Sequence, residues 1–184
     1  MLFFAIALLV SAAAALEDWR SGEISNVLTL GALALSPFLH LGRTMQLGGA
    51  WSDGLLAGGM SLLGALACGV VPYLLFVKGG ARGGDVKLCA ALGAILKPVV
   101  GIEAVFYGFL AAALIAPARL AYEGKLFRTL KGSFFLLMNP LLPKSRRVEL
   151  DPETMTWVRM GPAFLLGVII TTALHYPDIM GSRR

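Results

Sequence analysis

The sequence predicts an all-α, polytopic integral membrane protein: a bundle of about six transmembrane helices with a cytoplasmic interfacial segment. Hydrophobic residues make up 57% of the 184 residues, whereas charged residues make up only 15%. The apolar residues fall in long runs that short polar stretches separate, and the mean hydropathy is positive. A soluble domain of this size would carry far more charge on its surface.

The first three helices can be placed from the apolar runs. We expect the first two at residues 1–16 and 27–41. The first run could be mistaken for a signal peptide, but it lacks a basic region at its start, so we interpret it as a retained helix. The second should be broken at Pro37. The third, at residues 55–77, is continuously apolar, and its glycines would let neighbouring helices approach closely.

The second half of the chain predicts three more crossings. Residues 86–117 are too long for one crossing and slightly short for two, so we expect two short helices with a turn at Lys97 and Pro98. Residues 118–156 mix basic residues with Leu and Phe, which suits a helix lying in the membrane interface. The last span is expected at residues 158–174.

Charge gives the expected orientation and domain organisation. We expect one membrane-embedded domain over residues 1–184, with the basic segment 118–156 inside it. If Met1 starts outside the cell, most basic residues fall in cytoplasmic loops, as the positive-inside rule requires. The net charge of +5 therefore indicates topology and contact with anionic membrane lipid. No nucleic-acid motif accompanies it, so nucleic acid is not an expected partner.

Two acidic residues stand at the cytoplasmic ends of predicted helices. Asp18 follows the first apolar run and opens the stretch DWRSGEISN, and Asp85 lies between the glycine-rich turn GGARGG and an apolar helix. Two crossings separate them, and two crossings return the chain to the side that it left. The sequence therefore predicts both carboxylates at one membrane face, where a buried charge needs a structural or functional reason.

Such a pair could hydrolyse an amide. Two facing carboxylates near a low-dielectric boundary tend to share one proton. The ionised member takes a proton from a water while the protonated member donates to the carbonyl oxygen, with no metal and no cofactor. Gly83 and Gly84 would let an extended substrate approach the backbone. Lys87 could hold an anionic substrate group or influence the titration of the pair.

Simpler structural roles stay open for each of these residues. Asp85 is a good helix N-cap, and Asp18 could pair with Arg20. Lys87 and Arg82 could be anchors at the cytoplasmic face. Other polar residues fall at outer helix ends, where interfacial or solvated roles are expected: His40, Asp53, Glu103, His175 and Asp178.

At these residues the chain resembles the type IV prepilin peptidase family, membrane aspartyl peptidases that remove leader peptides from prepilins. GGDVKLCAALGAIL resembles the second catalytic motif, Gly-x-Gly-Asp followed by Lys and a helix of small residues. DWRSGEISN resembles the first, in which the catalytic Asp precedes Ile-Pro-Asn, and residues 161–163 resemble the Gly-Pro of the terminal helix. The sequence departs from the family at Arg82, which replaces the first motif glycine, and at Ser25, which replaces the proline before Asn26.

The resemblance implies an aspartic-type endopeptidase with Asp18 and Asp85 as catalytic residues. The residues expected to bind substrate or shape the loops are Asn26, Gly83, Gly84 and Lys87. The substrate would be a prepilin or pseudopilin, cut after a Gly at the cytoplasmic face of the cell inner (plasma) membrane. Larger members carry a methyltransferase domain with cysteine pairs between the first two helices. Only a short polar stretch lies there in this chain, so we expect the peptidase-only branch associated with Flp or tight-adherence pili.

Two other functions stay open. A non-catalytic transporter or secretion-assembly subunit could use the two carboxylates to carry protons or to hold helices together. A transporter would be expected to place charge near the bilayer midplane and to contain internal repeats, and the sequence has neither feature. Another intramembrane aspartyl peptidase, of the presenilin or preflagellin-peptidase kind, would share the two aspartates and cut other substrates.

Overall fold

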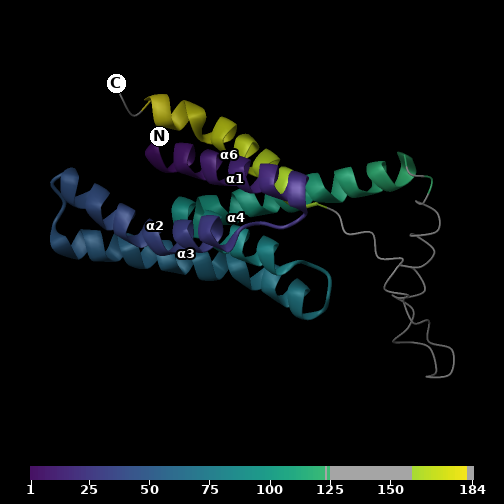
Figure 1. The fold of residues 1–184 in the computed structure, drawn as a ribbon. Coiled ribbons are helices and arrows are strands. Elements are labelled where there is room, and N and C mark those ends of the chain that lie inside the picture. Colours follow the sequence, from purple (N-terminus) through teal and green to yellow (C-terminus); the bar gives the residue numbers. More distant parts are fainter. Residues whose placement is uncertain (123, 125–158, 182–184) are drawn as a thin grey trace, which may run out of the picture. The chain divides into compact units, whose positions relative to one another are not determined.

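The computed structural model describes residues 1–122, 124 and 159–181, and in these residues every regular element is a helix (Figure 1). The helices are α1 (Leu2–Ser21), α2 (Asn26–Gln46), α3 (Trp51–Val77), α4 (Gly83–Tyr122) and α6 (Gly161–Gly181). The all-α prediction is confirmed for this part of the chain.

The chain divides into two compact units. The first contains residues 1–111 and 159–184, and the second contains residues 112–158. In the second unit the structure describes the end of α4 and residue 124. Most of the basic segment expected at 118–156 therefore lies outside the described residues, and the expectation of a single domain stays a prediction.

In the described part of the chain, three helices are long and apolar enough to cross a membrane. They are α1, α3 and the Gly83–Ala118 part of α4, while Gly161–Pro177 of α6 is a shorter apolar helix. Large apolar side chains such as Leu9 and Phe38 are mostly exposed, which suits a surface that meets lipid. These features support a membrane protein, and the count of six crossings stays a prediction.

The helix α1 is longer than predicted, because it continues beyond its apolar run to Ser21. It ends at Gly22, whose φ of 73° is the left-handed conformation that glycine adopts without strain. The Gly22 N–H donates to the carbonyl oxygen of Asp18 at 3.0 Å, as in a common helix C-cap. Asp18 therefore lies in the last turn of a helix and does not open a loop.

The helix α2 passes through Pro37, so the predicted break there is wrong. A proline removes one bond inside the helix, but neighbouring helices and local adjustments make this tolerable in a membrane span. Ser25 is the N-cap of the helix, and its side-chain oxygen accepts the N–H of Leu28 at 3.2 Å. It packs along α3 (Figure 1), where a methyl group on Gly58 would lie only 3.2 Å from the Pro37 carbonyl oxygen.

The helix α4 reverses direction at Lys97. This residue has φ 65° and ψ 172°, and Pro98 follows it, so the helix cannot continue across this point. A methyl group added to Gly101 would lie 2.9 Å from the Cα atom of Gly93. Gly93 and Gly101 are eight residues apart, so in a straight helix they would be separated by about 12 Å along the axis. The predicted turn at Lys97 and Pro98 is therefore confirmed.

Neighbouring helices bond the carbonyl groups beside this turn. The Ser61 hydroxyl of α3 donates to the Ala94 carbonyl at 2.7 Å, and His40 Nε2 of α2 donates to the Ile95 carbonyl at 2.9 Å. His40 is buried and stacks on the Phe3 ring, with centroids 3.7 Å apart. The expectation that His40 is an interfacial residue is therefore wrong. The Ile95 carbonyl in the apolar interior needs a hydrogen-bond donor, and the buried His40 side chain supplies it.

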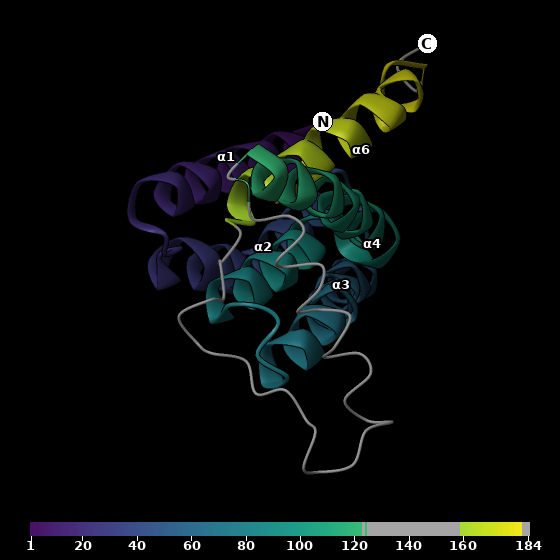
Figure 2. The same ribbon diagram turned by 90° about the vertical axis from the view of Figure 1, so that its right-hand side faces the viewer.

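The helix α6 packs along α1 (Figure 2) and against the returning half of α4. The ring of Phe164 is fully buried and meets the Phe109 ring edge-on at 5.3 Å between centroids. A methyl group on Gly167 would collide with the carbonyl oxygen of Ala104. Close packing at glycine thus fixes where α6 lies against α4.

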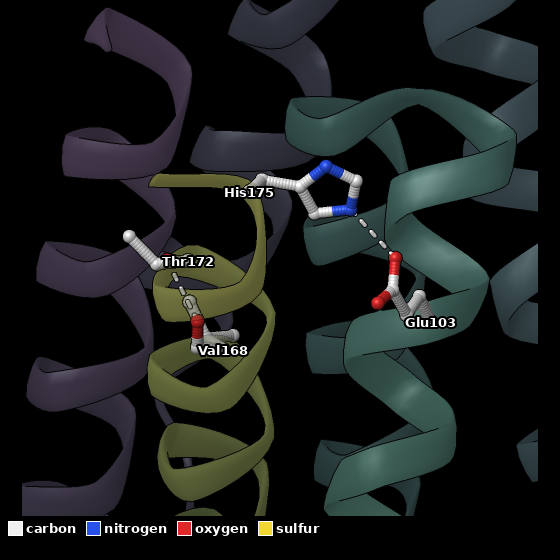
Figure 3. A network of polar contacts seen from close by, with 4 residues as sticks. All are labelled: Glu103, Val168, Thr172 and His175. Atoms are coloured by element: carbon white, nitrogen blue, oxygen red, sulfur yellow. Dashed lines mark hydrogen bonds and ion pairs between the residues drawn. The ribbon is translucent and has the colours of Figure 1, made fainter. Parts of the chain in front are cut away.

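The second half of α6 makes two polar contacts that Figure 3 shows, one to α4 and one within α6. Nε2 of His175 donates to Oε2 of Glu103 at 2.7 Å (Figure 3). One turn earlier, the Thr172 hydroxyl donates to the Val168 carbonyl of its own helix at 2.7 Å (Figure 3). The sequence predicts a solvated role at a helix end for Glu103 and an interfacial role for His175. Both side chains are about one third exposed, and they are paired with each other.

Candidate active site

Both predicted acidic residues lie at one end of the helices in the first unit. Asp18 is in the last turn of α1, and Asp85 is in the first turn of α4. Their exposed fractions are 3% and 4%, which is unusual for carboxylates without a structural or functional reason. The two helix ends are joined by Arg82, whose Nη1 donates to the carbonyl oxygen of Gly22, directly after α1, at 2.5 Å. The structure therefore brings together the two residues that the sequence singled out.

The carboxylate of Asp18 is bonded by the start of α6. The N–H of Gly161, the first residue of that helix, donates to Oδ2 of Asp18 at 2.9 Å. The first N–H groups of a helix have no partner within the helix, so this donor is available for a side chain. Just before α6, Arg159 donates to the carbonyl oxygen of Trp19, the residue after Asp18.

The carboxylate of Asp85 caps its own helix. Its Oδ2 accepts the N–H of Arg82, the residue before α4, at 3.2 Å. This is the bond that an acidic residue makes at the third helical position in a capping box. The prediction that Asp85 could be the N-cap is wrong in position, because Arg82 precedes the helix and Asp85 is its third residue, but its side chain does bond the first turn. A cap of this kind is compatible with a chemical role, because it uses only one of the two carboxylate oxygens.

Arg82 occupies the position of the first motif glycine without backbone strain. Among the described non-glycine residues, only Lys97 has a positive φ, so position 82 does not need glycine for its conformation. The left-handed residue of this loop is Gly79, with φ 75°. Nη1 of Arg82 donates to the carbonyl oxygen of Gly22 at 2.5 Å. The arginine thus adds a bond between the loop before α4 and the end of α1.

The other predicted site residues lie around Asp85. Gly83 and Gly84 are the first residues of α4 and are helical, so the glycine-rich turn ends at Arg82, two residues earlier than predicted. A methyl group on Gly84 would lie 3.4 Å from Cβ of Ile24. Nζ of Lys87 donates to Oδ1 of Asn26 at 2.7 Å. Lys87 and Asn26 therefore join α4 to α2, and their roles toward a substrate stay predictions.

The sequence does not predict that Gly161 bonds Asp18 or that Arg159 bonds Trp19, the next residue. The Gly-Pro pair that begins at Gly161 is a signal for a helix start, and it was matched to the terminal helix without a role. The contact between this Gly-Pro pair and the end of α1 depends on how α6 packs on α1. No local pattern in the sequence contains that information.

A comparison with protein families gives a match over residues 3–117 to the type IV leader peptidase family. The matched residues make up more than half of the chain and include both Asp18 and Asp85. The chain belongs to the type IV leader peptidase family. As a leader peptidase family member it is a peptidase, in agreement with the resemblance drawn from its motifs. Comparisons with curated proteins and with solved structures give no match.

Proposed function

We propose that this protein is an aspartic-type prepilin peptidase with Asp18 and Asp85 as its catalytic pair. The observation that carries the proposal is the burial of both carboxylates at one end of the helices, in the part of the chain that matches the leader peptidase family. Buried carboxylates that interact with one another are typical of functional sites.

The pair would work by general acid and base catalysis. Two interacting carboxylates do not both ionise easily, so they share one proton. The ionised carboxylate accepts a proton from a bound water, whose oxygen attacks the carbonyl carbon, while the protonated carboxylate donates to the carbonyl oxygen. The tetrahedral intermediate then collapses, and a proton passes to the leaving amine. The proposal needs neither a metal nor a cofactor.

The proposed substrate is a membrane-inserted prepilin or pseudopilin, cut after a Gly at the cytoplasmic face of the inner membrane. The charge distribution supports this orientation. Basic residues at the end of the helices that carries the aspartates are Arg20, Lys78, Arg82, Lys87 and Arg159. Among the residues that the structure describes, those at the opposite end are Arg43 and Lys97, and the sequence predicts Arg183 and Arg184 on that side as well. The positive-inside rule places the more basic end in the cytoplasm.

The proposal includes six crossings. The helices α1, α2, α3 and α6 would each cross once, and α4 would cross twice because it reverses at Lys97. The resemblance of the motifs to the short branch associated with Flp or tight-adherence pili suggests the kind of pilin. The short polar connection between α1 and α2 agrees with that branch.

The test is cleavage of a co-expressed model prepilin with a basic leader that ends in Gly before an apolar helix. We expect Asp18→Asn and Asp85→Asn each to abolish cleavage, because either change removes a carboxylate that the proton transfers need. The enzyme should still be inserted in the membrane. Asp53→Asn is the control, since Asp53 caps α3 at the opposite end and should leave cleavage normal. Near-normal cleavage by either of the first two variants would show the assignment to be wrong.

Membership of a peptidase family favours this proposal over a transporter or a secretion-assembly subunit. A presenilin-like or preflagellin peptidase would use the same two aspartates, so substrate distinguishes it. In the same assay a preflagellin should stay uncut while the prepilin is processed. The opposite result would assign the chain to that other branch of membrane aspartyl peptidases.

A further inference from the structure

The start of α6 reaches the carboxylate of Asp18 from outside the segment that matches the family. The N–H of Gly161 donates to Oδ2 of Asp18 at 2.9 Å, and the bond is buried. The family match ends at residue 117, so this contact joins the catalytic segment to a separate part of the chain. Gly161 therefore contacts a proposed catalytic carboxylate directly.

Space, not backbone conformation, explains why this position holds glycine. Gly161 is not among the described residues with a positive φ. A methyl group added there would lie 2.9 Å from Cβ of Asp18, 3.1 Å from its Oδ2 and 3.0 Å from Cα of Ala15. Because Ala15 contributes backbone of α1, it cannot move aside easily. An alanine at 161 would therefore turn the Asp18 side chain or push the start of α6 away.

Other contacts hold the start of α6 in place. Arg159 donates to the carbonyl oxygen of Trp19, and its guanidinium carbon lies 5.9 Å from the centre of the Trp19 ring, within range of a cation-π contact. One turn into α6, the fully buried Phe164 packs in the core. The Gly161 N–H is thus presented to Asp18 by a helix end that is anchored on both sides.

We propose that Gly161 is a positioning residue of the active site: its N–H and its lack of a side chain fix how the Asp18 carboxylate is oriented. The helix α6 thereby completes a site whose acidic residues lie on α1 and α4. The inference rests on the proposed function, in which Asp18 is catalytic. A hydrogen bond to a carboxylate is strongly directional, and small displacements of a catalytic group slow a reaction considerably.

The kinetic test uses Gly161→Ala in the full-length enzyme, purified in detergent, with the model prepilin as substrate. We expect kcat to fall by about 10- to 100-fold, because the added methyl group displaces the Asp18 carboxylate. KM should change by less than about twofold, since the interaction that is lost acts on the chemical step. A kcat close to that of the wild-type enzyme in a folded Gly161→Ala variant would overturn the inference.

Two glycine variants serve as controls. Gly59→Ala places a methyl group in α3 where nothing lies within 4 Å, so both kcat and thermal stability should be unchanged. Gly167 lies in α6, like Gly161, but away from Asp18. Gly167→Ala brings a methyl group against the Ala104 carbonyl of α4 and should mainly lower stability. If Gly161→Ala and Gly167→Ala lost stability and kcat in the same proportion, Gly161 would act only in packing and the inference would fail.

A measurement without turnover separates this inference from the proposed function. Labelling methionine with ¹³C at the carbonyl and glycine with ¹⁵N selects the amides of two Met-Gly pairs, Met160–Gly161 and Met180–Gly181. In Asp18→Ala the Gly161 proton signal should move upfield, because it loses a carboxylate acceptor. The Gly181 signal should stay where it is.

The outcomes of the two experiments are distinguishable. A Gly161 signal that does not respond to Asp18→Ala would overturn the positioning role, even if the wild-type enzyme cleaves prepilin. If the signal responds and the wild-type enzyme does not cleave, the proposed function fails while the contact stands. If the signal responds and Gly161→Ala loses kcat as expected, both are supported.

Discussion

At the scale of single residues, Arg82 joins the two helix ends that carry the aspartates. Its guanidinium donates to the carbonyl oxygen of Gly22, which lies one turn after Asp18 in α1. Its backbone N–H donates to Asp85. The side chain that replaces the motif glycine thus links the end of α1 to the start of α4. A flexible glycine could not form the first of these bonds.

The first prediction concerns this link. We expect Arg82→Met to lower the free energy of unfolding by about 1–2 kcal/mol, because a partly buried charge-assisted hydrogen bond is lost. Cleavage of the model prepilin should slow as well, while Arg82→Lys should retain part of the activity. Thermal unfolding and initial cleavage rates measure these effects.

The same experiment has a control and a contrary outcome. Lys78→Met removes a neighbouring exposed basic residue at the end of α3 and should leave both quantities unchanged. Arg82→Gly restores the motif residue but also removes the bond, so it should behave like Arg82→Met. A faster enzyme after Arg82→Gly would mean that the arginine does not stabilise the site.

Sequence could predict the aspartates but not their partners. Asp18 and Asp85 stand out because acidic residues next to apolar runs are rare and costly. The bonds from Gly161 and Arg82 join positions far apart in the chain. They depend on the packing of α6 and on the path of a loop, which no local pattern fixes. From the sequence, Arg82 is a departure from the motif and a possible anchor at the cytoplasmic face, and neither interpretation predicts its bond to Gly22.

At the scale of elements, the reversal of α4 depends on donors from other helices. Pro98 has no N–H and Lys97 leaves the helical conformation, so carbonyl groups in the preceding turn lose their usual partners. The Ser61 hydroxyl supplies one of the missing bonds, to the Ala94 carbonyl, and His40 supplies another. The end of the first half of α4 is thus held by α2 and α3.

The second prediction compares two buried serines. Ser61→Ala removes a bond between α3 and α4 and should lower stability by about 1 kcal/mol. Ser36→Ala removes a bond from Ser36 to the Ala32 carbonyl of its own helix. It should have a smaller effect, because that carbonyl also has a backbone partner. Unfolding of each variant in detergent measures the difference, and equal losses would contradict the assigned role of Ser61.

The helices could be predicted better than their ends and interruptions. Long apolar runs locate helices in a membrane protein, and Lys97 followed by Pro98 signalled the turn in α4. The end of α1 was placed too early because a polar last turn still forms when Gly22 provides the C-cap. A proline predicts a helix break, but α2 continues from Asn26 to Gln46 with Pro37 inside it. The sequence predicts His40 at the interface, whereas the structure buries it. Its partner is the Ile95 carbonyl, which lacks a helical partner only because α4 turns at Lys97.

At the scale of the whole molecule, the proposed function depends on the side of the membrane that the aspartates face. The loop between α1 and α2 and the loop between α3 and α4 lie at one end of the helices. The loop between α2 and α3 lies at the other end. If α4 crosses twice, its turn at Lys97 lies with the loop between α2 and α3. The orientation can therefore be tested at a few exposed positions.

The last prediction uses single cysteines and a maleimide that cannot cross the membrane. Cys68 and Cys89 are buried, so the wild-type protein should give almost no signal. In intact cells, Gln46→Cys at the end of α2 and Val99→Cys at the turn of α4 should be labelled from outside, since both positions are exposed. Glu23→Cys, between α1 and α2, should be labelled only after the cells are opened, because the proposed orientation places that loop in the cytoplasm. Labelling of Glu23→Cys in intact cells would place the aspartates on the wrong side for a prepilin leader, and a Val99→Cys that reacts only in opened cells would rule out two crossings by α4.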